Sequence, residues 1–388
     1  MYDVIVCGAG PAGSVAATVL ARGNARVLLL DRARFPRDKL CGDTLNPGTI
    51  ALLERLRLTS GLAAAARPVD GMIVTGERGV RVRAEYGDGA KGLAMLRRNL
   101  DAALAGEAVS AGVRFEDGVM VRGPLMESAS RGARVRGVIL AGRDGKDLRV
   151  PAPLVIAADG RRSRLALPLG LSRHPSHPRR WAIGAYFDGV AGLTSFGEMH
   201  VRRGRYLGIA AVPSGAANVC LVVPAPASAA RGARDGGFED PSGLLHRVIA
   251  DDPALRERFA DARMTTAPVV LGPLAVDARA AGAPGLLLAG DAAGFIDPMT
   301  GDGLRFAVRG AELAAEAALA SLAGANAHPH VTLARARRRE FSAKWRFNRT
   351  LRRLVDRGTT VEIAGLVAAS APWLLRRTIA FAGDVPSR

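Results

Sequence analysis

The chain has 388 residues, of which 48% are hydrophobic, so an intrinsically disordered chain is excluded and there is room for two or three domains. Its three cysteines are too few for a disulfide framework and indicate a reducing, cytoplasmic compartment. The first apolar stretch carries Asp3 and breaks at a glycine turn, and no apolar run reaches the roughly 18 residues of a membrane span. We therefore expect neither a signal peptide nor a spanning helix.

The chain is strongly basic, with a formal net charge of +18. Residues 335–388 hold 13 Lys and Arg against 4 Asp and Glu, and this excess of 9 is half of the total. Such a charge attracts an anionic membrane, an acidic carrier protein or nucleic acid, whereas an Arg-rich composition can also simply solvate helix faces. Aromatic residues make up only 5%, which argues against a nucleic-acid partner. Solvated helix faces and peripheral contact with a membrane or acidic carrier both stay open.

Residues 1–31 read as a strand, a glycine turn, an Ala-rich helix and a second strand that ends on an acid. The turn contains Gly8, Gly10 and Gly13 in the pattern G-x-G-x-x-G. The first glycine of such a turn permits the bend, the second lets the backbone approach a pyrophosphate, and the third lets the helix pack on the strand. Asp31 stands close to the place of the acid that holds a ribose hydroxyl. The stretch predicts a dinucleotide site, and the alternative is an ordinary βαβ unit.

A loop rich in proline and glycine follows over residues 32–48, before a helix predicted over 49–58. The loop carries Cys41 among basic side chains, a setting that favours the thiolate. Because the loop leaves the second strand, it runs along the face where a cofactor's reactive ring would lie. Cys41 is therefore our candidate catalytic residue, with a structural loop cysteine as the alternative. Cys7 and Cys220 lie in apolar runs and are expected to be inert core residues.

The middle of the chain continues the nucleotide fold. A helix is predicted over residues 96–111, and a strand meander over 113–157 runs into Asp159 and Gly160. A strand that ends in Asp-Gly puts a carboxylate and a flexible turn at the edge of the sheet where α/β proteins bind ligands.

A second sheet is predicted from the alternating patterns of residues 69–95 and 181–270. Within it we expect a helix over 242–259 and a loop over 225–240. The nucleotide fold then resumes with a buried strand that ends at Gly290 and Asp291. After this strand we expect a helix from about 304 to 322, whose N-terminus points at the predicted dinucleotide site. Two further helices are expected near 331–357 and 361–380.

These patterns predict an α/β protein: a Rossmann-like cofactor-binding domain with an inserted, mostly antiparallel β-sheet substrate domain and C-terminal helices. The predicted cofactor domain is discontinuous (1–68, 96–180 and 271–325), the substrate domain comprises 69–95 and 181–270, and the helical segment is 326–388. A second GxGxxG unit is absent, so we expect no dedicated nicotinamide domain, and His and Cys show no metal-ligand spacing.

Three separated motifs stand together in the sequence: GAGPAG at 8–13, IAADG at 156–160 and GDAAGFIDPMTGDG at 290–303. In this order and spacing they resemble the aromatic-hydroxylase class of FAD-dependent oxidoreductases, whose R-x-x-L-D also matches residues 97–101. The resemblance implies extended FAD, with its pyrophosphate on the glycine turn, and NAD(P)H at most as a transient electron donor. The residues it implies at the cofactor are Gly8, Gly10, Pro11, Ala12, Gly13, Asp31, Arg32, Cys41, Gly42, Arg97, Val119, Asp159, Gly160, Gly290, Asp291, Pro298, Gly301, Asp302, Gly303 and Leu304.

Within this class, FPRDKLCGD at 35–43 looks like the P-x-x-K-x-C-G signature of the geranylgeranyl reductase family. The Y-x-W-x-F-P element of that family is present only in weakened form at 206–213, without its Trp and Phe. Flavin-dependent halogenases share FPR, but their W-x-W-x-I-P is absent.

The resemblance implies that reduced flavin acts on a hydrophobic small molecule, prenyl- or polyketide-like. The Cys41 loop favours reduction of a carbon–carbon double bond. The weakened prenyl element and the class at large favour a monooxygenase that hydroxylates or epoxidises an aromatic or polyketide substrate. A prenyl carrier without redox chemistry is a further alternative, although the intact glycine turn and Asp31 argue against it.

Overall fold

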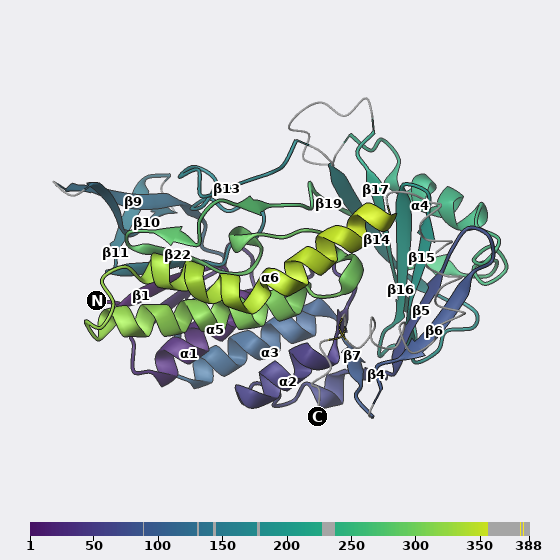
Figure 1. The fold of residues 1–388 in the computed structure, drawn as a ribbon, viewed down its shortest axis with the longest axis horizontal. Helices are drawn as coiled ribbons and strands as arrows, with labels where there is room; N and C mark the ends of the chain where they lie inside the picture. Colours follow the sequence, from purple (N-terminus) through teal and green to yellow (C-terminus); the bar gives the residue numbers. More distant parts are fainter. Residues whose placement is uncertain are drawn as a thin grey trace.

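The computed structural model describes residues 1–355 with the exception of 88, 130–131, 143–144, 177–178 and 227–236, and in addition residues 381 and 383. The molecule is elongated, with a helix-covered sheet in one half and a large second sheet in the other (Figure 1).

The first half is built on a six-stranded sheet whose order is β21-β22-β12-β1-β2-β8. All neighbours in this sheet are parallel except β21, which is antiparallel to β22. The parallel strands therefore end at one edge, the edge where α/β proteins bind ligands. Its strands are β1 (Val4–Cys7), β2 (Val27–Leu30), β8 (Arg114–Glu116), β12 (Leu154–Ala157), β21 (Gly282–Ala283) and β22 (Leu286–Leu288).

Both faces of this sheet are covered, which explains why its strands are continuous apolar runs rather than alternating ones. Val4 and Val6 pack among the helices, whereas Ile5 and Cys7 pack under a three-stranded antiparallel sheet on the other face. That sheet consists of β9 (Val121–Ala129), β10 (Gly132–Ala141) and β11 (Asp147–Pro151). The helices are α1 (Pro11–Arg22), α2 (Pro47–Arg55), α3 (Arg97–Ser110), α5 (Gly303–Leu322) and α6 (Pro329–Val355).

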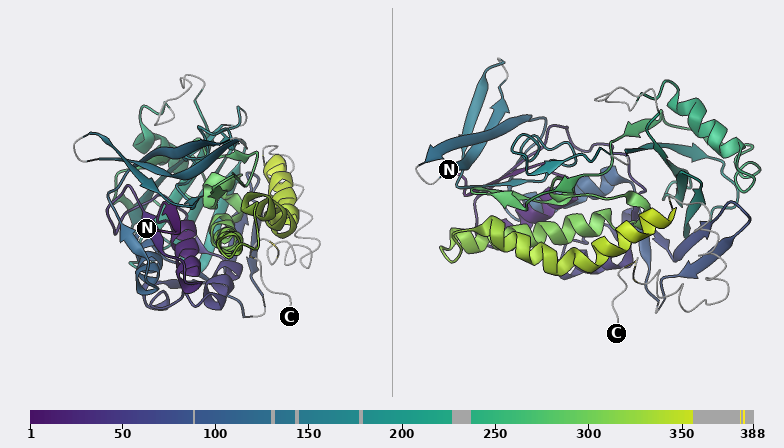
Figure 2. Two further views of the ribbon diagram at one scale, coloured as in Figure 1. Left: turned by 90° about the vertical axis from the view of Figure 1, so that its left-hand side faces the viewer. Right: turned by 45° about the horizontal axis from the view of Figure 1, so that its top comes forward.

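The second half holds an eight-stranded sheet, which we call the large sheet. Its order is β18-β14-β17-β16-β15-β5-β6, with β19 also paired to β14, and only β5 and β15 run parallel. Figure 2 shows it at the opposite end of the molecule from β9–β11. Its elements are β5 (Gly71–Thr75), β6 (Arg81–Glu85), β14 (Arg180–Asp188), β15 (Phe196–Arg202), β16 (Arg205–Ala211), β17 (Ala217–Pro224), β18 (Arg263–Met264) and β19 (Val269–Leu271), and α4 (Pro241–Ala250) covers its outer face.

Short elements join the two halves. They are β3 (Thr44–Leu45), β4 (Arg67–Val69) and β7 (Gly92–Ala94) in one small sheet, β13 (Ser172–Arg173) with β20 (Asp277–Ala278), and the 3₁₀ turns η1 (Ala63–Ala65), η2 (Gly290–Ala293) and η3 (Pro298–Thr300).

The predicted fold class is confirmed: an α/β cofactor fold carries an inserted, mostly antiparallel sheet. The predicted helix over 242–259 ends earlier, at Ala250, because Pro253 disfavours helical geometry in the residue before it. The predicted helix over 361–380 and most of the loop over 225–240 lie outside the described residues. The domain boundaries stay a prediction.

Helix α6 is fixed to the rest of the protein by a buried ion pair. The Lys344 Nζ lies 3.2 Å from the Asp302 carboxylate just before α5, and both side chains are almost fully buried. Asn348 and Asn46 donate to the same carboxylate at 3.1 and 3.3 Å. Asp302 therefore ties α6, α5 and the start of α2 together.

Replacing Lys344 tests this anchor. Lys344→Ala removes the cation that lies 3.2 Å from the buried Asp302 carboxylate, and we expect the free energy of unfolding to fall by about 3 kcal/mol in urea denaturation. Arg346→Ala, two residues along the same helix but exposed, is the control and should change it by less than about 0.5 kcal/mol. Equal effects of the two substitutions would contradict the anchoring role.

Candidate active site

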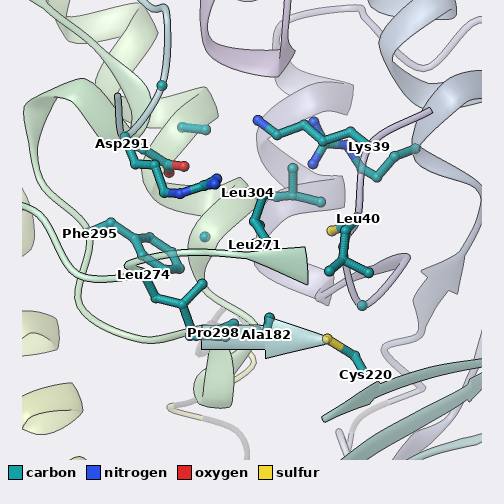
Figure 3. Close-up of a pocket in the computed structure, with 18 of the residues that line it drawn as sticks. Lys39, Leu40, Ala182, Cys220, Leu271, Leu274, Asp291, Phe295, Pro298 and Leu304 are labelled. Carbon is teal, nitrogen blue, oxygen red and sulfur yellow. The ribbon is translucent and has the colours of Figure 1, made fainter. Parts of the chain in front are cut away.

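A cavity of about 220 Å³ lies between the two halves of the molecule (Figure 3). Its lining comes from the glycine turn before α1, the loop around Cys41, the turn after β12, the segment 290–304 and the inner face of the large sheet. Segments far apart in the sequence thus meet at one place, at the carboxyl edge of the parallel strands.

The glycine turn is packed too tightly for side chains. Gly8 has a φ of 99°, and a Cβ built there would lie 2.4 Å from the Ala158 oxygen. A Cβ at Gly13 would lie only 1.7 Å from the Gly8 oxygen. By contrast, a Cβ built at Gly10 would meet no atom closer than the Arg37 guanidinium, at 3.5 Å. No side chain caps the N-terminus of α1, so its first N–H groups are available to an anion.

Asp31 stabilises this turn from the end of β2. Its carboxylate accepts hydrogen bonds from the backbone N–H groups of Ala9 at 2.8 Å and Ala33 at 2.9 Å, and Arg37 lies 3.7 Å away. The Val119 N–H donates to the Asp31 carbonyl. The two residues expected near the adenosine thus lie together, outside the cavity.

Basic side chains gather at the Cys41 end of the cavity. Burial opposes the charge of Arg97, but Asp101 and the Cys41 thiol together raise the pKa of Arg97 above its usual value. Burial lowers the pKa of Lys39, and Arg97 lowers it further, whereas Asp291 raises it. Figure 3 shows Lys39 and Asp291 on opposite sides of the cavity. This end therefore suits an anionic ligand.

The turn after β12 contributes Ala158, Gly160 and Arg161 to the lining. Burial and the neighbouring Arg162 lower the pKa of Arg161 to about 10, although Asp291 raises it. Asp159 does not line the cavity, because its carboxylate accepts a hydrogen bond from the Arg164 N–H at 2.7 Å.

The segment 290–304 supplies a second helix N-terminus. No side chain caps the start of α5, and the neighbouring Asp302 is instead committed to Lys344. The segment is held to the large sheet because the Tyr206 hydroxyl donates to the Asp297 carboxylate. Burial, together with Asp297, raises the pKa of Tyr206 well above its ordinary value, so the hydroxyl stays protonated.

The opposite wall of the cavity is apolar. The inserted sheet was expected to bind the substrate, but the residues of this wall were not identified from the sequence. The wall consists of residues on one face of five strands of the large sheet, together with two residues from the loops that follow. Cys220, expected in the core, is half-buried and faces this cavity. The period-two pattern of the strands was the available signal, but it does not reveal which face meets a ligand. The wall comprises Ala182, Met199, Tyr206, Gly208, Cys220, Val222, Leu271, Leu274 and Phe295.

The cavity brings together most of the predicted cofactor residues. Those in the lining are Gly10, Pro11, Ala12, Cys41, Gly42, Arg97, Gly160, Gly290, Asp291, Pro298, Gly301, Gly303 and Leu304. Outside it lie Gly8, Gly13, Asp31, Arg32, Val119, Asp159 and Asp302. The first five of these surround the glycine turn and the end of β2, where an extended ligand would continue, whereas Asp159 and Asp302 bind other parts of the chain.

These residues fit FAD. A pyrophosphate suits the glycine turn, the two uncapped helix N-termini and the basic side chains at the Cys41 end of the cavity. An extended dinucleotide suits a site that continues from the cavity to the end of β2. Among the residues that the structure describes, there is no group of three or more His, Cys, Asp or Glu that could hold a metal ion. None of the helices within the described part of the chain combines the length and the apolar character that a membrane span requires.

A solved structure with the same fold is that of a flavin-dependent brominase. It superimposes with a TM-score of 0.81 at 20% identity, covering 99% of this chain and 94% of the brominase. At this identity the match shows a shared fold only.

Several known proteins are similar to this chain in amino-acid sequence as well. Menaquinone reductase of Mycolicibacterium smegmatis is 32% identical over 335 residues, covering 81% of this chain and 75% of the relative. Digeranylgeranylglycerophospholipid reductase 2 of Methanopyrus kandleri is 31% identical over 332 residues, covering 82% and 76%. Conditioned medium factor receptor 1 of Dictyostelium discoideum is 28% identical over 343 residues, covering 81% of this chain but only 62% of that longer protein.

The family model of the FAD binding domain matches residues 1–345. This range includes the glycine turn, the Cys41 loop, the cavity wall and most of α6. The chain therefore belongs to the FAD-binding domain family and is an FAD-dependent oxidoreductase of the aromatic-hydroxylase class, with reductases among its relatives.

Proposed function

We propose that this oxidoreductase reduces a carbon–carbon double bond in an apolar small molecule, such as a prenyl-bearing lipid or quinone. The observation that carries the proposal is that one cavity joins the Cys41 loop and the cofactor-binding glycines to an apolar wall. The names of two relatives, a menaquinone reductase and a digeranylgeranylglycerophospholipid reductase, support the same substrate class.

When bound, FAD supplies the hydride for such a reduction. We propose NAD(P)H as a transient donor that reduces the flavin, since the sequence holds no second GxGxxG unit for a resident nicotinamide. Hydride addition to one carbon of the double bond requires a proton at the other carbon. The chain must therefore provide an acid in the cavity.

Cys41 is the proposed acid, because its thiol lines the cavity next to the Arg97 guanidinium. The Sγ–H proton goes to the substrate carbon, and the thiolate that remains is stabilised by the adjacent cation. The apolar wall meanwhile excludes water from the reacting carbons.

A buried polar cluster below the loop positions Cys41. The Asn218 side chain of β17 donates to the Cys41 carbonyl at 2.9 Å and to the Asp43 carboxylate at 2.6 Å. The Tyr186 hydroxyl of β14 donates to the same carboxylate. Burial raises the pKa of Asp43 to about 6, although hydrogen bonds from Tyr186 and Asn218 act in the opposite direction.

The second candidate is a monooxygenase that hydroxylates or epoxidises an aromatic or polyketide substrate. The fold shared with a flavin-dependent brominase supports it, because that protein is named for a flavin-dependent bromination rather than for a reduction. A carrier without redox chemistry is disfavoured by the intact glycine cradle.

We also propose a peripheral contact through α6, with an anionic membrane or an acidic carrier. The exposed residues Arg335, Arg338, Arg339, Arg346 and Arg349 recur at helical spacing and form one face of the helix. Glu340, the acid within this stretch, is turned to Arg305 and Arg309 of α5 instead.

A single turnover without oxygen tests the proposed reduction. Enzyme is reduced with dithionite, freed of the excess and mixed anaerobically with a short-chain menaquinone or a geranylgeranyl lipid. The protein is then removed, and the product is reoxidised in air to return any quinol to the quinone. We expect mass spectrometry to find two added hydrogens that survive reoxidation, as a reduced carbon–carbon double bond would. Cys41→Ala should keep its flavin but lose roughly 100-fold in rate, the usual contribution of a general acid. Product that forms only after oxygen is admitted would support the monooxygenase instead, and an unchanged rate in Cys41→Ala would remove the acid role.

The pKa of Asp43 predicts a pH-dependent stability. It is raised to about 6 from the ordinary 3.8, so between these values the folded protein holds a proton that the unfolded chain has released. The contribution of Asp43 to the free energy of unfolding should therefore fall as the pH rises from 4 to 6, by about 2 kcal/mol. Asp43→Asn should lose this component in urea unfolding across the range; parallel curves for variant and wild type would contradict it.

A further inference from the structure

One position in the apolar wall has no reason to be glycine within the protein itself. Gly208 lies in the middle of β16, which pairs with β15 and β17 without a shift in register around it. Its φ does not lie in the left-handed region that favours glycine. A glycine inside a strand costs about 0.5–1 kcal/mol relative to alanine. Some other requirement must therefore keep the position free of a side chain.

Neighbouring protein atoms do not supply that requirement. A Cβ built at Gly208 would meet only the backbone oxygens of Cys220 and Glu198, each at 3.9 Å, which is ordinary contact. Gly184, in the same cross-strand row, is different, because its Cβ would lie 2.2 Å from the Leu40 side chain. Leu40 thus fills the space above Gly184, while the space above Gly208 belongs to the cavity. A glycine of this kind in a strand marks the close approach of a ligand.

The space above Gly208 lies between two side chains of the neighbouring strands. Met199 and Cys220 oppose Gly208 on the two neighbouring strands and face the same cavity. Because strands lie about 4.8 Å apart, the backbones that carry these two side chains are about 10 Å apart, with the bare backbone of Gly208 between them. That width exceeds what a single linear hydrocarbon chain needs.

A fixed aromatic ring borders the same space. Tyr206 precedes Gly208 by two residues on β16, faces the cavity and is buried. Its hydroxyl donates to Asp297, so the outer end of the side chain is held in place. Aromatic rings favour other rings in offset or edge-to-face contact, and the surrounding wall is apolar.

From this geometry we infer that Gly208 is a specificity-determining residue, against which a planar ring of the substrate lies flat on the backbone of β16. The inference rests on the proposed function and deepens it: the substrate class is an apolar molecule that carries a ring, such as a prenylated quinone, rather than a purely linear prenyl lipid.

Binding to graded variants tests the inference. The probes are a naphthoquinone with a short prenyl chain and a geranylgeranyl lipid without a ring, titrated into FAD-loaded protein with flavin absorbance as the readout. We expect Gly208→Val to weaken binding of the quinone at least tenfold and that of the ring-free lipid less than twofold. Gly208→Ala, which adds only the tolerated Cβ, should weaken quinone binding by a smaller factor and covers the case in which the valine variant does not fold.

Gly123→Val is the matched control, because Gly123 lies in β9, outside the cavity, and has no atom within 4 Å of its Cβ position. It should bind both probes as the wild type does. Equal weakening of the two probes by Gly208→Val, or wild-type binding of the quinone, would overturn the inference. The binding measurement tests the role of Gly208 independently of the proposed reaction. A quinone that binds as expected but is not reduced in the absence of oxygen would contradict the proposed reductase activity alone.

Discussion

The approach of α1 to β1 is the contact on which the cofactor site depends. A Cβ at Gly13 would lie 1.7 Å from the Gly8 oxygen, so only glycine lets the helix start directly above the strand. This places the uncapped N–H groups of α1 at the carboxyl edge of the sheet, beside the cavity. Asp31 then holds the turn in place by accepting the Ala9 N–H at 2.8 Å. The remaining cofactor segments are arranged around this turn.

Parallel strands explain why distant segments meet there. β2 and β12 run parallel to β1, and β22 runs parallel to β12, so the loops that follow these three strands emerge at one edge. Those loops carry Cys41, the turn at Gly160 and the segment after Gly290. The large sheet closes the site from the other side, and the bond from Tyr206 to Asp297 joins it to the cofactor half. In the proposed function, redox chemistry and substrate binding fall to separate halves that share this one cavity.

The sequence alone predicted those parts of the site in which the backbone conformation is decided by neighbouring residues in the chain. Gly8, Gly13 and the glycines after Gly290 are required by tight turns and close approaches, and such requirements are visible in a motif. Side-chain direction was harder to predict. Asp302 stands next to lining glycines, yet its side chain pairs with Lys344 of α6, 42 residues further along the chain. The wall residues alternate as in any half-buried strand, so Cys220 could equally have faced the core.

Flavin retention tests most directly whether the glycine turn and Asp31 hold the cofactor. The bound FAD of purified Asp31→Ala would be measured by absorbance after extensive dialysis, with circular dichroism to verify the fold. Asp3→Ala is the control, since Asp3 pairs with the exposed Arg26 away from the turn. Loss of most FAD from Asp31→Ala, with full retention in Asp3→Ala, is the predicted result. Full flavin occupancy in folded Asp31→Ala would contradict it.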